Sequence, residues 1–170
     1  MDRLRVYVET TVPSYLTAFR SSNPRRALQQ EITAEWWQVA PQRFEWFVSD
    51  LVWEEISEGD STAAKERQGA LAGIPRLSVN DDVLHLAVVY ELSLGIPPKA
   101  KSDGLHLAFA VAYEMDYLVT WNCAHIMNLD VIRKLRAPRT LVRGEKHRLF
   151  SRLKPCSNLW RTNHVERPRR

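Results

Sequence analysis

The sequence predicts an α/β fold, a three-layer α/β/α sandwich around a mostly parallel central sheet. Short runs rich in β-branched and aromatic residues alternate with segments of helical periodicity, and this alternation is typical of a parallel sheet. The chain has 170 residues, which suits one compact domain with a sizeable core. In such sheets the loops at the carboxyl ends of the strands build the functional site.

Four strands are expected. The first is LRVYVE (4–9), and the Thr, Pro and Ser residues of the following TTVPS end it and can start a helix. The others are RFEWFVS (43–49), RLSV (76–79) and DYLVTW (116–121). Glu9 therefore stands at the carboxyl end of the first strand and Asn122 follows the last.

Helices are expected between these strands. Residues 23–39 have a helical composition with proline in the first turn, and residues 50–59 read as a helix that stops at Gly59. Asn80 is a good N-cap for a helix over residues 81–94. Two glycines interrupt the helical composition of residues 66–75, so the structure of that segment is left open.

Another helix is expected to begin near Asp103, because Leu105, Ala108, Phe109 and Ala112 follow helical spacing. This places Asp103 in the first turn of the helix. A last helix is expected over residues 128–135.

The charge distribution divides the chain at residue 136. Residues 1–136 hold 14 basic and 18 acidic side chains, whereas residues 137–170 hold 10 and 2. Periodicity also fades there, so a compact domain over 1–136 and an irregular or disordered basic tail over 137–170 are expected. Such a tail can bind RNA phosphates, or it can simply be solvated.

Cys123 and Cys156 are too few for a disulfide framework and fit a reducing compartment, so a cytoplasmic location is expected. No stretch approaches the roughly 18 apolar residues of a membrane helix, so a soluble protein without membrane association is expected. The pair formed by Cys123 and His125 lacks the recurrent spacing of a zinc module.

Four oxygen-bearing side chains are expected at one edge of the sheet: Glu9, Glu55, Asp103 and Asn122. Carboxylates stay ionised and close together only when a cation or proton neutralises them, and hard cations such as Mg2+ and Mn2+ prefer oxygen ligands. Each residue also has an ordinary explanation as a solvated surface group or a helix-terminal charge.

Three segments, VYVETTVPSYL, VSDLVWEEI and KSDGLHLAFAVAYEMDYLVTWN, resemble the successive motifs of PIN-domain proteins, particularly VapC-like toxin ribonucleases. The resemblance spans residues 4–135. Glu9 with Thr10 matches the family's first acid and the hydroxyl residue after it. Ser49 and Glu55 match the serine and acid six residues apart, Asp103 matches the third acid, and Asn122 takes the place of the fourth.

The resemblance implies a metal-dependent endoribonuclease that hydrolyses RNA phosphodiester bonds with Mg2+ or Mn2+. It implies Glu9 and Asp103 as the main metal ligands, Glu55 as a residue that holds a water or acts as base, and Asn122 as a water or outer-shell contact. It also implies a cognate antitoxin partner and a homodimer. Thr10 and Thr120 are expected to hydrogen-bond ligands or the scissile phosphate, or to cap strand ends.

Two positions depart from the family pattern. Glu9 replaces the usual aspartate and keeps its charge, whereas Asn122 replaces an acid and contributes none. The expected site therefore carries three carboxylates, which suits one metal better than two. The alternative function is a catalytically weakened PIN module that binds RNA or a protein partner, and a third is a basic-tailed interaction protein.

Several neighbouring residues could serve either the site or the structure of the fold. Glu54 points about 100 degrees away from Glu55 on a helix, so the motif spacing selects Glu55. His106 lies one turn after Asp103, where a structural role is favoured over contact with the ligand shell. The remaining candidates are the tryptophans, expected in a core or dimer face, and two lysines that can steer phosphate or solvate a loop: Trp36, Trp37, Trp46, Trp53, Trp121, Lys99 and Lys101.

Overall fold

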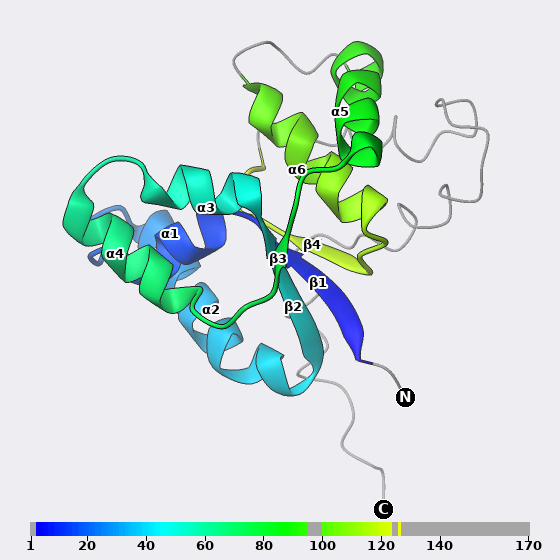
Figure 1. Cartoon of the computed structure of the whole chain (residues 1–170). Helices are drawn as coiled ribbons and strands as arrows, with labels where there is room; N and C mark the ends of the chain where they lie inside the picture. The colour runs from blue at the N-terminus through cyan, green and yellow to red at the C-terminus, as the bar shows by residue number, and fades with distance from the viewer. Residues whose placement is uncertain (1–2, 95–99, 124–125, 127–170) are drawn as a thin grey trace, which may run out of the picture.

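A parallel sheet forms the centre of the computed structural model, which describes residues 3–94, 100–123 and 126 (Figure 1). Its strands are β1 (Leu4–Val8), β2 (Phe44–Ser49), β3 (Arg76–Leu77) and β4 (Tyr117–Val119), in the spatial order β3-β2-β1-β4. All three strand pairs are parallel. The predicted α/β class is confirmed, and the described sheet is parallel throughout.

Helices cover both faces of this sheet. The helical elements are α1 (Thr11–Thr17), α2 (Pro24–Val39), the 3-10 turn η1 (Ala40–Gln42), α3 (Asp50–Ser57), α4 (Ser61–Ala70), α5 (Asp81–Leu94) and α6 (Lys101–Ala112). In Figure 1, α1, α2 and α4 lie on one side of the sheet and α5 and α6 on the other. This arrangement is the expected three-layer sandwich.

Polar side chains begin several helices as the sequence predicts. Asn23 accepts a hydrogen bond from the Arg26 backbone at the start of α2, and Asn80 accepts one from Val83 at the start of α5. Ser49 caps α3 by accepting a 3.2 Å hydrogen bond from the Val52 amide. The strand β2 therefore runs directly into α3 at a buried serine.

Glycines mark the ends of two helical segments. Helix α3 ends at Ser57 with Glu58 as its C-cap, and Gly59, which adopts a φ of 84°, follows as the glycine at which the predicted helix stops. In the open segment 66–75, α4 continues through Gly69 to Ala70, and the chain turns at Gly73, whose φ is 82°. Gly69 is thus tolerated inside a helix that Asp60 caps with two hydrogen bonds.

Aromatic side chains make much of the core. Phe109 of α6 is fully buried and stacks on Tyr7 of β1, with ring centroids 6.1 Å apart. Trp36 of α2 and Trp46 of β2 are also buried and stack nearly parallel at 4.8 Å, with Trp37 packed edge-on against Trp46. For Trp36 and Trp46 the predicted core role is confirmed.

Some predictions fall outside the described residues: the helix over 128–135, the tail over 137–170, Lys99, His125 and Cys156. Within the described ranges, no helix combines the length and apolar character needed to cross a bilayer.

Candidate functional site

The sheet order brings three sequence-distant segments to one edge. Strands β2 and β4 flank β1 in parallel, so their carboxyl ends meet beside that of β1. Val8 pairs with Val119, and the Glu9 amide donates a 3.1 Å hydrogen bond to the Val119 carbonyl. Glu9 and Thr120 consequently lie side by side although 111 positions separate them.

The Glu9 carboxylate has one anchored oxygen and one open oxygen. Its side chain is buried, and Oε2 accepts hydrogen bonds from the Thr11 amide (3.1 Å), the Thr11 hydroxyl (2.5 Å) and the Thr120 hydroxyl (2.7 Å). Oε1 accepts no hydrogen bond from any side chain or amide in the described ranges, and His106 Nε2 lies 3.9 Å from it. Three donors thus fix the carboxylate so that Oε1 faces the site.

Glu55 reaches the same place from the second turn of α3. Its Oε2 accepts a hydrogen bond from the Thr10 hydroxyl and a 3.0 Å hydrogen bond from His106 Nε2. Burial opposes ionisation of Glu55, but His106, by hydrogen bonding and by its charge when protonated, together with the Thr10 and Ser102 hydroxyls, outweighs burial and lowers the pKa of Glu55. Glu55 is therefore a carboxylate at neutral pH.

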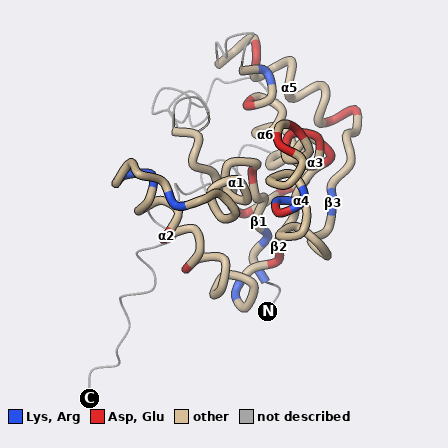
Figure 2. Tube along the Cα trace, turned by 90° about the vertical axis from the view of Figure 1, so that its left-hand side faces the viewer, with Lys and Arg blue, Asp and Glu red and all other residues tan. Residues whose placement is uncertain are grey.

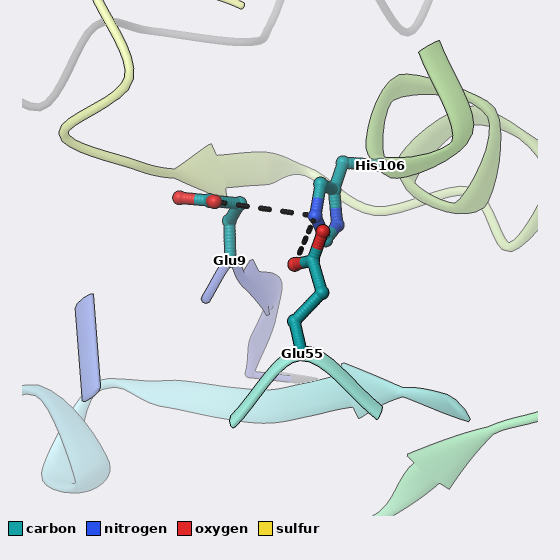
Figure 3. A group of neighbouring side chains, drawn as sticks. All are labelled: Glu9, Glu55 and His106. Atoms are coloured by element: carbon teal, nitrogen blue, oxygen red, sulfur yellow. Dashed lines mark hydrogen bonds and ion pairs between the residues drawn. The ribbon is translucent and has the colours of Figure 1, made fainter. Parts of the chain in front are cut away.

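Glu9, Glu55 and His106 form a compact cluster, here called the Glu–Glu–His group (Figure 3). One ligand atom from each lies within 4.8 Å of the others. Glu9 and His106 are almost fully buried, and about a quarter of the Glu55 side-chain surface is exposed. Two carboxylates this close repel each other, and a bound cation would relieve that repulsion.

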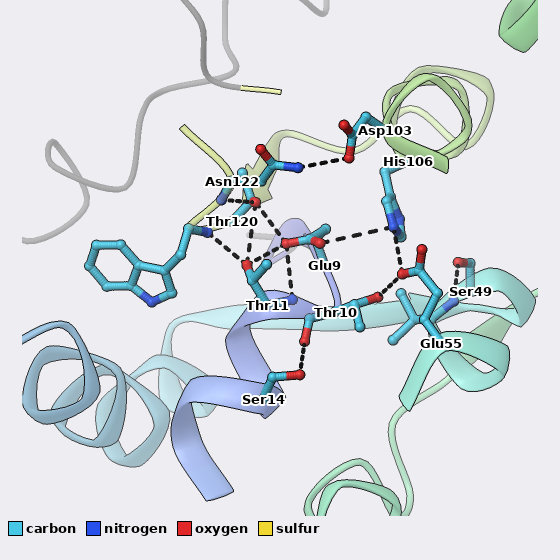
Figure 4. Close-up of polar contacts among 12 residues, drawn as sticks. Glu9, Thr10, Thr11, Ser14, Ser49, Glu55, Asp103, His106, Thr120 and Asn122 are labelled. Atoms are coloured by element: carbon cyan, nitrogen blue, oxygen red, sulfur yellow. Dashed lines mark hydrogen bonds and ion pairs between the residues drawn. The ribbon is translucent and has the colours of Figure 1, made fainter. Parts of the chain in front are cut away.

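Asp103 and Asn122 form a second pair at this edge. The side-chain Nδ2 of Asn122 donates a 2.7 Å hydrogen bond to Asp103 Oδ1, and the backbone N–H of Asn122 donates to the Thr120 hydroxyl at 2.8 Å. Thr120 in turn donates to Glu9, so a continuous chain of hydrogen bonds joins Asp103 to Glu9 (Figure 4). Asp103 itself is not part of the Glu–Glu–His group.

All four predicted site residues therefore gather at one edge, but in two subsets. Glu9 and Glu55 share the Glu–Glu–His group, whereas Asp103 pairs with Asn122. Glu54 is exposed while Glu55 turns inward, as the motif spacing predicts. That Glu9, Asp103 and Glu55 ligate a metal remains a prediction.

The predicted threonines take distinct places. Thr10 donates to Glu55 and Thr120 donates to Glu9, so both hydrogen-bond predicted ligands. Of the predicted phosphate-steering lysines, Lys101 lies within the described residues, where it pairs with Glu91 at 3.3 Å.

Two residues of the site were not identified from the sequence: Thr11, which hydrogen-bonds Glu9, and Tyr7, which hydrogen-bonds His106. Thr11 supplies two of the three donors to Glu9 Oε2, and its hydroxyl also accepts a 2.8 Å hydrogen bond from the Trp121 amide. Tyr7 lies two positions before Glu9, and alternate residues of a strand share a face. That period of two is the signal that could have identified Tyr7; no pattern distinguishes Thr11 from Thr10.

Acidic side chains are frequent along α3. Asp50, Glu54, Glu55 and Glu58 follow one another along α3 and the turn after it, whereas arginines occupy the start of α2 (Figure 2). Negative potential around buried carboxylates favours entry of a cation.

The geometry thus provides an oxygen-rich, partly buried site at the carboxyl edge of a parallel sheet. Comparison with protein-family models, with curated proteins and with solved structures found no match to this chain.

Proposed function

We propose that the protein is a metal-dependent endoribonuclease that hydrolyses RNA phosphodiester bonds. The observation that carries the proposal is the open Oε1 of buried Glu9 facing the ionised carboxylate of Glu55 within the Glu–Glu–His group. The ordered resemblance of residues 4–135 to PIN-domain ribonucleases adds the substrate class, RNA.

The residues present fit a hard divalent cation. Glu9 Oε1 has no described donor, and Glu55 supplies a second carboxylate that stays ionised. Mg2+ and Mn2+ accept such oxygen ligands, and Mg2+ often uses only one or two carboxylates. Glu9 and Glu55 would hold the cation, with Asp103 completing the set of carboxylates on the same edge.

When bound, the cation supplies electrophilic stabilisation of the charge that develops on the phosphate. Glu55, ionised at neutral pH, is able to accept the proton of an attacking water. That water would displace the 3′-oxygen of the preceding nucleotide, which leaves with a proton as a hydroxyl, and the downstream product keeps a 5′-phosphate. Asn122 would hold Asp103 in place through its 2.7 Å hydrogen bond.

The biological setting belongs to the proposal as well. The resemblance suggests a toxin that a cognate antitoxin holds inactive, and a homodimer. The presence of only two cysteines suggests a cytoplasmic location. A small antitoxin-like reading frame beside the gene would support the toxin role.

Cleavage of labelled RNA with Mg2+, with Mn2+ and with a chelator tests the activity. We expect metal-dependent cleavage to 5′-phosphate products, and its loss in Asp103→Asn and Glu9→Gln without unfolding. Glu54→Gln is the matched control, because Glu54 is exposed and adjoins Glu55. Undiminished cleavage by both site variants would exclude these residues from the reaction.

A second candidate is an RNA-binding module with weakened catalysis. The hydrogen bond from Asn122 favours it, because an amide occupies one oxygen of Asp103 where a fourth carboxylate would otherwise stand. Purified protein that binds RNA but cuts none with either metal would support this candidate over the nuclease.

A further inference from the structure

A buried chain of hydrogen bonds leads from the N-cap of α3 to Glu55. The Ser49 hydroxyl contacts the Tyr7 hydroxyl at 2.7 Å, and Tyr7 contacts His106 Nδ1 at 2.8 Å. His106 Nε2 then contacts Glu55 Oε2 at 3.0 Å. Ser49, Tyr7 and His106 are each at most 1 % exposed, so water does not substitute for these contacts.

The Glu55 end of the chain sets the role of the imidazole. Glu55 Oε2 already accepts a hydrogen bond from the Thr10 hydroxyl, so this oxygen acts as an acceptor toward His106 as well. His106 Nε2 must therefore carry a proton and donate it to the hydrogen bond. In the neutral imidazole, Nδ1 is then left as an acceptor, and Tyr7 must donate to it.

The Ser49 end is consistent with the same direction. Ser49 accepts from the Val52 amide, and its own hydroxyl proton goes to the Tyr7 oxygen. Ser49, Tyr7 and His106 then each donate once along the chain, toward Glu55.

The opposite direction leaves a donor unused. If His106 carried both ring protons, Tyr7 would have to accept from Nδ1 and donate to Ser49. Ser49 would then accept from both Tyr7 and Val52, and its hydroxyl proton would have no acceptor within the described residues. A buried unpaired hydroxyl proton costs free energy, so the direction toward Glu55 is preferred.

We propose that Tyr7 and His106 are positioning residues that hold Glu55 through one directed chain, in which Nε2 of His106 donates to Glu55 and Nδ1 of His106 accepts from Tyr7. The chain begins at Ser49, the N-cap of α3, and ends at Glu55 in the second turn of the same helix. It passes through β1 at Tyr7 and α6 at His106. Hydrogen bonds therefore connect the Glu55 carboxylate to α6 through His106 and, beyond it, to β1 through Tyr7.

The tautomer also decides which atoms remain for a cation. A protonated Nε2 has no lone pair to offer, so His106 is excluded as a metal ligand in this arrangement. The Glu–Glu–His group then presents oxygen alone, which favours Mg2+ or Mn2+ over Zn2+. This consequence rests on the proposed nuclease function, whereas the tautomer does not.

Nitrogen-15 NMR of the histidine rings in the full-length protein tests the tautomer independently of any activity. We expect the His106 signals, assigned by their loss in His106→Gln, to show a protonated Nε2 and an unprotonated Nδ1, with and without Mg2+. An unprotonated Nε2, or a ring protonated at both nitrogens near neutral pH, would overturn the proposal even if RNA cleavage were found.

Tyr7→Phe tests positioning, because it removes only the phenolic oxygen. We expect Mn2+ affinity, measured by calorimetry, to fall about tenfold or more, as for other residues that orient a ligand. Tyr113→Phe is the matched control, since it removes a hydroxyl with a 2.7 Å hydrogen bond to Ser78 away from the site. Equal Mn2+ affinities in the two variants would overturn the positioning role.

His106→Gln and His106→Leu separate donation from packing. Gln can place an amide donor near the position of Nε2, so it should bind Mn2+ more tightly than Leu. Equal affinities in these two folded variants would contradict the proposal. If His106→Leu does not fold, the NMR measurement and Tyr7→Phe decide. If wild-type protein binds no Mn2+ at all, the proposed function fails and the NMR measurement alone decides the tautomer.

Discussion

Asn122 donates a 2.7 Å hydrogen bond from Nδ2 to Oδ1 of Asp103, and this contact defines what the amide does in the site. Asp103 is buried, with 7 % of its surface exposed, so the orientation of its carboxylate depends on such contacts. A carboxylate at position 122 would face Asp103 with an acceptor instead of a donor. The amide therefore gives this buried acid a hydrogen-bond donor and adds no second negative charge.

Asn122→Asp is expected to destabilise the metal-free protein by about 1–3 kcal/mol at neutral pH, because it exchanges a hydrogen bond for repulsion between carboxylates. The same change should increase the stabilisation that Mn2+ gives, since the added charge attracts the cation. Thermal unfolding with and without Mn2+ measures both effects.

Asn122→Ala is the control, since it removes the hydrogen bond without adding charge. It should lose stability without gaining stabilisation by Mn2+. If Mn2+ stabilises Asn122→Asp and Asn122→Ala by the same amount, Asn122 does not adjoin the cation.

Glu55 should make stability depend on pH. Its pKa is lowered from an ordinary value of 4.5, so the folded protein holds this proton less tightly than the unfolded chain. Its contribution is present above pH 4.5 and is lost as the pH falls through the lowered pKa of the folded state. Glu55→Gln should therefore destabilise the protein at neutral pH, and this effect should shrink progressively as the pH falls below 4.5, as measured by urea unfolding.

Glu54→Gln provides the comparison for this pH series, because Glu54 is exposed one position away. The difference in unfolding free energy between wild type and Glu54→Gln should change little with pH. A Glu55→Gln difference that grew as the solution became more acidic would contradict the lowered pKa.

Thr11 should control the position of Glu9. Its hydroxyl donates to Glu9 Oε2 at 2.5 Å and accepts from the Trp121 amide at 2.8 Å, so Thr11→Val leaves both partners short of a hydrogen bond. We expect a loss of about 1–3 kcal/mol in stability and a fall of about tenfold or more in Mn2+ affinity. Thr11→Ser, which keeps the hydroxyl, should recover most of the affinity. A Ser variant as weak as the Val variant would show that the methyl group matters instead.

Phe109 should be a principal determinant of stability. Its ring is fully buried between Tyr7 and Tyr113, at 6.1 Å and 6.3 Å from their centroids. Phe109→Ala is expected to cost about 3–5 kcal/mol in unfolding free energy. Phe19→Ala should stay within about 0.5 kcal/mol of wild type, since Phe19 is 97 % exposed. Similar losses in the two variants would contradict this core.

The sequence predicts the sheet and most helices because their signals are local. The β-rich run of β1, the proline at the start of α2 and the Asn80 cap each depend on residues a few positions apart. The stop of α3 was predictable from Gly59, which stands just past the C-cap Glu58, but the last helical residue, Ser57, was not given. Helix stop signals mark a boundary only to within a residue or two.

The residues of the site were predictable, but their partners were not. Glu9, Glu55, Asp103 and Asn122 were identified from spacing and resemblance, and the structure brings them to one edge. Their division into two pairs depends on side-chain rotamers and on contacts across elements, which no local pattern encodes. The role of Thr11 in holding Glu9 is of this kind.

The strand order has a consequence for when the site can form during protein synthesis. Glu9 is made near the start of synthesis, but its donor Thr120 follows 111 positions later, directly after β4, the strand that pairs with the carboxyl half of β1. Contacts between residues so far apart in sequence form slowly, because the chain loses conformational entropy on closing the loop before the contacts contribute favourable free energy. A growing chain that ends before Tyr117 has no β4, so it carries the acids of the site without the neighbour that fixes them. The site should therefore mature only after nearly all of the sheet-forming sequence has been translated.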